Sequence, residues 1–117
     1  MTIKDIINEL RLNVLTGTDQ LDNQVKGAYV SDLLSDVMGK AGNGELWITL
    51  HTHPNIVAVA ALKELAAILI VNGGIPDNET INVAAKENIP ILGTTERAFP
   101  ICGRLYKIME ANAMVQG

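Results

Sequence analysis

Cysteine, aromatic residues and clustered positive charge are scarce in this sequence of 117 residues. Cys102 is the single cysteine, which excludes an internal disulfide and a metal cage of several thiolates from one chain. Four aromatic residues make a poor surface for stacking nucleic-acid bases. Nine Lys and Arg stand against 13 Asp and Glu and form no basic patch that would bind a phosphate backbone. We therefore expect no nucleic-acid partner.

Long apolar runs are missing as well. No uninterrupted stretch approaches the roughly 20 apolar residues of a membrane-spanning helix, and the first residues, Met1 to Asp5, contain no apolar signal segment. The length suits one domain that buries roughly two-thirds of its unfolded surface in a single core. We expect a cytoplasmic protein without a membrane partner, folded as one domain over residues 1–117.

The segment from Leu46 to Gly74 organises the predicted fold. It contains an apolar strand, a polar loop, an Ala-rich helix and a second apolar strand, at residues 46–50, 51–55, 56–65 and 67–71. Asn55 is the predicted N-cap of this helix. The second strand shows no polar alternation, which is typical of strands buried on both faces of a parallel sheet with helical crossovers.

Shorter periodic segments complete the pattern. We expect helices capped by Thr2, Ser31 and Asp77, and a last helix that starts near Pro100; their ranges are 3–10, 32–38, 79–87 and 100–113. Short strands are expected at 12–15, 25–30 and 89–92, with the first two as neighbours at one side of the sheet. The tail from Met114 to Gly117 is expected to fray. The alternation predicts an α/β sandwich with a sheet of about five mostly parallel short strands flanked by helices.

Polar residues follow three of the predicted strands. Open α/β sheets usually bind ligands at the carboxyl ends of their strands. There, helix amino termini leave N–H groups unpaired, and Gly73 and Gly74 would let a ligand approach the backbone. The commoner use of such residues is a tight turn with threonine caps, and that alternative stays open. The predicted site for a small anionic metabolite or nucleotide comprises Thr52, His53, Asn55, Asn72, Gly73, Gly74 and Thr94.

His51 and His53 are two residues apart and share a face if the strand extends that far. They can make structural hydrogen bonds, contact a small ligand or bind a metal. A metal site needs three or four ligands, and no other candidates have a recognisable spacing. We favour the hydrogen-bonding role, and we expect no metal and no cofactor.

Catalytic motifs are not found. Ser31 and Ser35 have no histidine nearby in the sequence, and the motif Gly-x-Ser-x-Gly is absent. The glycine-rich loop 39–44 follows a helix, and its Lys40 precedes Ala41, so it differs from a phosphate-binding P-loop. Cys102 is expected to pack as a small core residue. We expect that the protein is not an enzyme. The alternative is a phosphotransferase or a serine-kinase-like enzyme.

Several stretches together resemble a stand-alone DRTGG domain: AYVSDLLSDVM (28–38), WIT (47–49) with His53, NIVAVA (55–60), NGGIP (72–76) and NIPIL (88–92). The resemblance covers about residues 12–108. Two signature positions differ, because Thr52-His53 stands where the family has Asp-Arg, and Asn72 stands where it has Thr before Gly-Gly. The family's fold is similar to the amino-terminal domain of HPr kinase/phosphorylase. The resemblance implies a regulatory or oligomerising module with no catalytic residue to carry over.

These observations predict a non-catalytic regulatory or scaffolding domain, homodimeric, that senses a small anionic metabolite or nucleotide. A second alternative is a subunit that binds a partner protein without a ligand. Trp47 either fills the core or lies on a face covered by a second copy. Because aromatic residues are enriched at interfaces, we favour the homodimer.

Overall fold

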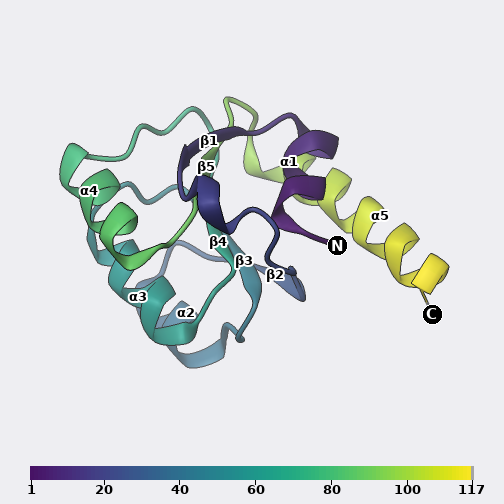
Figure 1. Ribbon diagram of the computed structural model, residues 1–117, viewed down its shortest axis with the longest axis horizontal. Helices are drawn as coiled ribbons and strands as arrows, with labels where there is room; N and C mark the ends of the chain where they lie inside the picture. The colour runs from purple at the N-terminus through teal and green to yellow at the C-terminus, as the bar shows by residue number, and fades with distance from the viewer. Residues whose placement is uncertain (117) are drawn as a thin grey trace.

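Helices and strands alternate along the chain, and a computed structural model, which describes residues 1–116, arranges them as one sheet with helices on both faces (Figure 1). The strands are β1 (Asn13–Thr16), β2 (Gly27–Val30), β3 (Glu45–Thr49), β4 (Ala67–Ile70) and β5 (Ile91–Gly93). The helices are α1 (Ile3–Leu10), α2 (Leu34–Lys40), α3 (Asn55–Lys63), α4 (Asn78–Glu87) and α5 (Ala98–Gln116), with a short 3-10 helix, η1 (Thr18–Gln20). No helix in this described range is long and apolar enough to cross a membrane.

The sheet has the order β1-β5-β4-β3-β2. The strands from β2 to β5 pair in parallel, and β1 pairs with β5 in the antiparallel direction. The predicted α/β fold with a mostly parallel, five-stranded sheet is therefore confirmed. The expected pairing of the first two strands is wrong: β1 and β2 lie at opposite edges, because the parallel strands fill the space between them.

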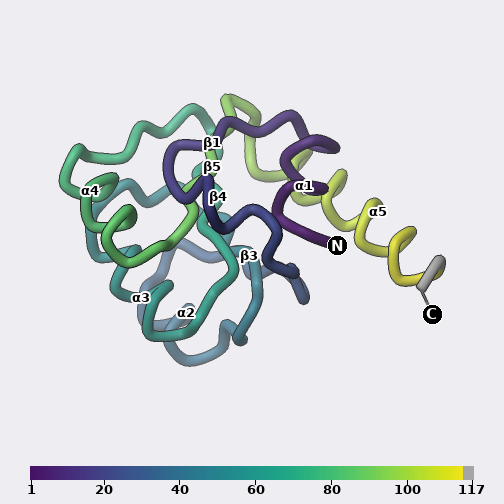
Figure 2. The backbone as a smooth tube through the Cα atoms, viewed as in Figure 1, coloured from purple at the N-terminus to yellow at the C-terminus, as the bar shows by residue number. Residues whose placement is uncertain are grey.

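Two apolar layers hold the helices on the sheet. On one face, α1 and α5 pack against Leu46, Ile48, Leu69 and Leu92. On the other face, α2, α3 and α4 pack against the alternate residues of the same strands, among them Ile68. All four residues of β4 are buried, as its unbroken apolar sequence predicts. The backbone trace in Figure 2 shows α2, α3 and α4 together on one side of the molecule and α1 with α5 on the other.

Trp47 belongs to the second of these layers. Its side chain is 0% exposed, and its indole N–H donates to the carbonyl oxygen of Ser31 at 2.8 Å. The core alternative for Trp47 is therefore confirmed, and its alternative place under a second copy is wrong.

Local capping decides where the helices begin. At α1, Thr2 Oγ1 accepts from the N–H of Asp5 (3.1 Å) and the Asp5 carboxylate accepts from the N–H of Thr2 (2.9 Å). This capping box confirms the predicted start, and the same hydrogen bonds lower the pKa of Asp5. At α3, the N-cap is Pro54 instead of the predicted Asn55, since His53 Nδ1 accepts from the N–H of Asn55 (3.1 Å).

The start of α2 differs most from the prediction. Ser31 Oγ accepts from the N–H of Leu33 (3.1 Å) in the loop, and the helix begins at Leu34. Asp32 lies before the helix, and its carboxylate accepts from Thr49 Oγ1 and from the N–H of Leu50, both at 2.8 Å. The predicted helical Asp32 with a Ser31 cap is therefore wrong, because the side chain binds the end of β3 instead.

The last helix, α5, begins two residues earlier than predicted, at Ala98, with Pro100 in its first turn. A proline is tolerated there because the first N–H groups of a helix have no partner within it. The helix continues through Gln116, where a frayed tail was expected, and Gly117 lies outside the described residues. Cys102 is partly buried against the first apolar layer, as predicted. Burial raises the pKa of its thiol, which makes it a poor nucleophile at neutral pH.

Candidate functional site

The connections that leave the parallel strands follow two different directions. After β2, β3 and β4 the chain passes to α2, α3 and α4 on one face, whereas after β5 it passes to α5 on the opposite face. Neighbouring strands whose connections diverge in this way open a crevice at their carboxyl ends. β4 and β5 are the parallel neighbours that diverge, so the crevice is expected between residues 71–77 and residues 94–97.

Backbone hydrogen bonds tie the loops after β4 and β5 together. The N–H of Gly73 donates to the carbonyl oxygen of Thr94 (2.9 Å), and the N–H of Asn72 donates to that of Glu96 (2.7 Å). Thr94 Oγ1 in turn accepts from the N–H of Glu96 at 3.1 Å. The N–H groups of Asn72 and Gly73 are thus engaged inside the protein and do not point freely at a ligand.

Four of the seven predicted site residues lie together around this point: Asn72, Gly73, Gly74 and Thr94. Thr52 lies nearby, but its carbonyl oxygen accepts from Thr80 Oγ1 (2.7 Å) and from the N–H of Asp77 (3.3 Å). It therefore joins the β3 loop to the start of α4.

The two histidines make hydrogen bonds at the end of β3. His53 and Asn55 form the amino-terminal turn of α3, where the imidazole accepts from the Asn55 N–H. His51 Nε2 hydrogen-bonds the carbonyl oxygen of Asp32, so this nitrogen carries the proton. In the described part of the chain, no three His, Cys, Asp or Glu side chains are grouped so as to hold a metal ion. The hydrogen-bonding role favoured for both histidines is the one the contacts show.

Two hollows flank the tied loops. The smaller, of about 280 Å³, lies against the edge strand β1 and is lined by Asn13, Leu15, residues 73–76 and residues 93–95. The larger, of about 620 Å³, lies over the start of α5 and is lined by Leu50, Asn72 and residues 97–100. Three predicted residues line the smaller hollow, whereas Asn72 lines the larger one. Thr52, His53 and Asn55 line neither.

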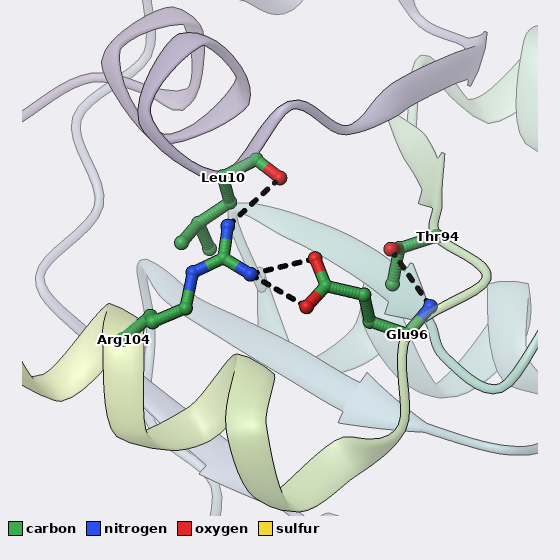
Figure 3. Close-up of polar contacts among 4 residues, drawn as sticks. All are labelled: Leu10, Thr94, Glu96 and Arg104. Carbon is green, nitrogen blue, oxygen red and sulfur yellow. Dashed lines mark hydrogen bonds and ion pairs between the residues drawn. The ribbon is translucent and has the colours of Figure 1, made fainter.

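Figure 3 shows the ion pair made by Glu96, the residue before Arg97. Arg104 Nη1 lies 2.6 Å from both carboxylate oxygens of Glu96, and its Nη2 donates to the carbonyl oxygen of Leu10 at 3.4 Å. The positive charge of Arg104 therefore offsets the negative charge of Glu96. Arg97 is exposed, lines the hollow and has no ion pair in the described chain, so the hollow carries a net positive charge.

Arg97 and Phe99 line the larger hollow and were not among the predicted site residues. The side chain of Phe99 is 90% exposed, which is unusual for a large aromatic residue. It lines the larger hollow together with Arg97. Both residues follow directly after the β5 exit, so extending the predicted site beyond Thr95 would have included them.

Comparisons with known proteins support the fold. No family model matches this sequence, and no curated protein matches it. A similar solved structure is that of the CBS and DRTGG domains of the regulatory region of Clostridium perfringens pyrophosphatase, in complex with the activator diadenosine tetraphosphate. The TM-score is 0.69 at 17% identity, and the match covers 86% of this chain and 44% of that chain. The resemblance to a DRTGG domain is thus confirmed at the level of the fold: the chain has the fold of part of a DRTGG-containing regulatory region.

Proposed function

We propose that this chain is a non-catalytic regulatory module that binds an anionic nucleotide or a small anionic metabolite where β4 and β5 diverge. One observation supports the proposal: the larger hollow there combines Arg97, a cation with no ion pair among the described residues, with an exposed aromatic ring, Phe99. A phosphate binds a guanidinium through charge-assisted hydrogen bonds, and a base stacks on an aromatic face. The two groups together fit a nucleotide better than an uncharged ligand.

The remaining groups in the hollow support the same ligand class. Asn72 brings a side-chain amide that can donate and accept, and α5 begins beneath the hollow with the positive end of its helix dipole. Of the predicted set, Asn72 keeps a direct role in this proposal. Gly73, Gly74 and Thr94 shape the loops beside it, and Thr52, His53 and Asn55 hold the neighbouring helices.

The structural neighbour supports a regulatory role. It is a regulatory region, and it was solved with a nucleotide activator. Since the present chain spans less than half of that neighbour, the activity of the whole pyrophosphatase is not transferred. We propose instead that this module reports ligand binding to a partner, and that one partner is a second copy of the chain.

Replacing Arg97 by glutamine is expected to weaken nucleotide binding by about 10–100-fold, because one charge-assisted contact to phosphate is worth roughly 1.5–3 kcal/mol. Adenosine mono-, di- and triphosphate and diadenosine tetraphosphate are the probes, titrated by calorimetry. Thermal shift gives a second measure, since ligand at 100 times its Kd should stabilise the wild type by about 2.7 kcal/mol.

Arg11→Gln is the matched control, because Arg11 is also exposed and lines neither hollow. Its affinity for the same probes should equal that of the wild type. Equal weakening by the two variants, or no binding of any probe, would refute the ligand site. Turnover of ATP that depends on Mg²⁺ would favour the phosphotransferase alternative.

A further inference from the structure

Three hollows lie in a row along one flank of α5. The first lies over the start of the helix and is the proposed ligand site, and an apolar groove of about 490 Å³ lies between β2 and the later turns of α5. A small hollow of about 70 Å³ lies between these two. It shares Leu50 and Ala98 with the ligand site, and Val30 and Ile48 with the groove. The three hollows therefore form one continuous furrow.

The walls of the furrow are continuous because of the periods of the elements that build them. On α5, the lining residues follow each other at spacings of three and four and so share one flank: Ala98, Cys102, Tyr106, Met109 and Ala113. On the sheet, the lining residues alternate along their strands and so share one face: Ala28, Val30, Ile48 and Leu50. An α-helix rises about 1.5 Å per residue, so the furrow runs for about 16 Å between Ala98 and Met109.

The furrow is apolar between its two ends. Val30 and Leu50, which line its middle, are 54% and 50% exposed, although large aliphatic side chains are usually buried. One end has Arg97 at the ligand site, and the charged residues of the other end lie in the groove: Lys26, Glu45 and Glu110. A contiguous exposed apolar surface with a polar rim is typical of a binding site.

The polar groups of the small hollow are already paired within the protein. The carboxylate of Asp32 accepts from Thr49 Oγ1 and from the N–H of Leu50, and Ser31 Oγ accepts from a backbone N–H of its own loop. These groups need no partner from a ligand, and the negative charge of Asp32 repels a phosphate. An anionic group is therefore held at Arg97, and only an uncharged part of a ligand passes through the small hollow.

We propose that the furrow binds a nucleotide whose phosphate carries an apolar acyl or alkyl chain. The nucleotide lies over the start of α5, and the chain runs through the small hollow into the groove between β2 and α5. The inference rests on the proposed function, because it starts from the same nucleotide site, and it deepens that function by naming the ligand class.

The width and the charge of the furrow favour this ligand over a segment of a partner protein. The small hollow has about 70 Å³, roughly the liquid volume of two water molecules, which suits a single hydrocarbon chain. A partner helix is about 10 Å across and is too wide for this constriction. Charge complementarity agrees, since a cation lies at the head of the furrow and uncharged apolar walls follow it.

The methyl and octyl esters of adenosine monophosphate test the inference, because the two esters carry the same charge and differ only in the chain. Complete burial of one methylene group strengthens binding about fourfold, and an open furrow covers only part of each group. The octyl ester is therefore expected to bind the wild type about 100-fold more tightly than the methyl ester, as measured by calorimetric titration.

Val30→Glu should reduce this ratio of affinities to less than about tenfold, because it places a charge where the chain enters the groove. Leu33→Glu is the matched control, since Leu33 is also exposed and lines none of the three hollows. This control should keep the wild-type ratio. Circular dichroism and the Tm confirm that each variant is folded, which both exposed positions allow.

Equal affinity of the wild type for the two esters would overturn the inference, as would a ratio that Val30→Glu leaves unchanged or that both variants reduce equally. Octyl methyl phosphate, which has the same charge and chain but no nucleoside, separates the inference from the proposed function. If the methyl ester binds and the octyl chain adds nothing, only the chain site is refuted. If octyl methyl phosphate binds as tightly as the octyl ester, the nucleotide site is refuted instead. Binding of neither ester would overturn both proposals.

Discussion

Replacement of Trp47 by alanine should lower the free energy of unfolding by about 3–5 kcal/mol, the usual cost of removing a fully buried aromatic side chain. The indole is 0% exposed and packs in the layer beneath α2 and α3. Its removal leaves a cavity that neighbours can fill only in part. It also removes the donor to the Ser31 carbonyl oxygen, which joins β3 to the segment after β2. Denaturant unfolding followed by far-UV circular dichroism measures the loss.

Phe99→Ala is the control for Trp47→Ala, because it also truncates an aromatic side chain, one that is 90% exposed. In the absence of ligand it should change stability by no more than about 0.5 kcal/mol. The loss of stability in Trp47→Phe should lie between the losses of these two variants, since Phe keeps much of the buried ring but cannot make the hydrogen bond. If the free energy of unfolding of Trp47→Ala differed from that of the wild type by less than about 1 kcal/mol, the ring would not be a core residue.

Trp47 also shows what an apolar sequence can and cannot predict. The unbroken apolar runs at 46–50 and 67–71 are sufficient to predict two buried parallel strands, because such strands need no polar face. Because apolar and polar residues do not alternate, the sequence does not indicate on which face of the sheet each side chain packs. The sequence alone therefore could not separate a core position for Trp47 from an interface position, and packing against α2 and α3 decided it.

Helix starts were predictable where the cap is local. Thr2 and Asp5 are three residues apart, and their reciprocal hydrogen bonds are a pattern that the sequence displays. Asp32 follows Ser31 in an equally good capping sequence, but its carboxylate binds Thr49 and Leu50, 17 and 18 residues away. Contacts at such separation depend on the tertiary fold, so the local pattern gave the wrong start for α2.

The predicted site residues lie after the carboxyl ends of the parallel strands, and they do not all line the same hollow. The exits of β3, β4 and β5 do meet at the carboxyl ends of parallel strands. Which two exits diverge depends on the face that α5 covers, and amphipathic patterning does not specify that face. The sequence therefore could not indicate that His53 and Asn55 form the start of α3, or that Arg97 lines the hollow beside Asn72.

Replacement of Gly17 by alanine is expected to destabilise the protein by about 2–4 kcal/mol, for two reasons that add. Gly17 has a φ of +84°, and a left-handed conformation costs an alanine roughly 1 kcal/mol. A Cβ there would also lie 2.5 Å from the Cα of Pro90, and relief of such overpacking costs about 1–3 kcal/mol. The turn cannot move away freely, because Thr16 Oγ1 donates to the carbonyl oxygen of Ile89 at 2.7 Å.

Gly73→Ala separates the two contributions to the Gly17 effect. Gly73 also has a positive φ, +70°, but a Cβ there meets no atom within 4 Å, so this variant should show the backbone cost alone. The difference between the two alanine variants, measured by denaturant unfolding, then gives the cost of the contact with Pro90. Equal losses would mean that the loop between β1 and η1 shifts to accept a side chain. A larger loss at Gly17 would establish that contact with Pro90 fixes the path of the chain as it leaves the antiparallel edge of the sheet.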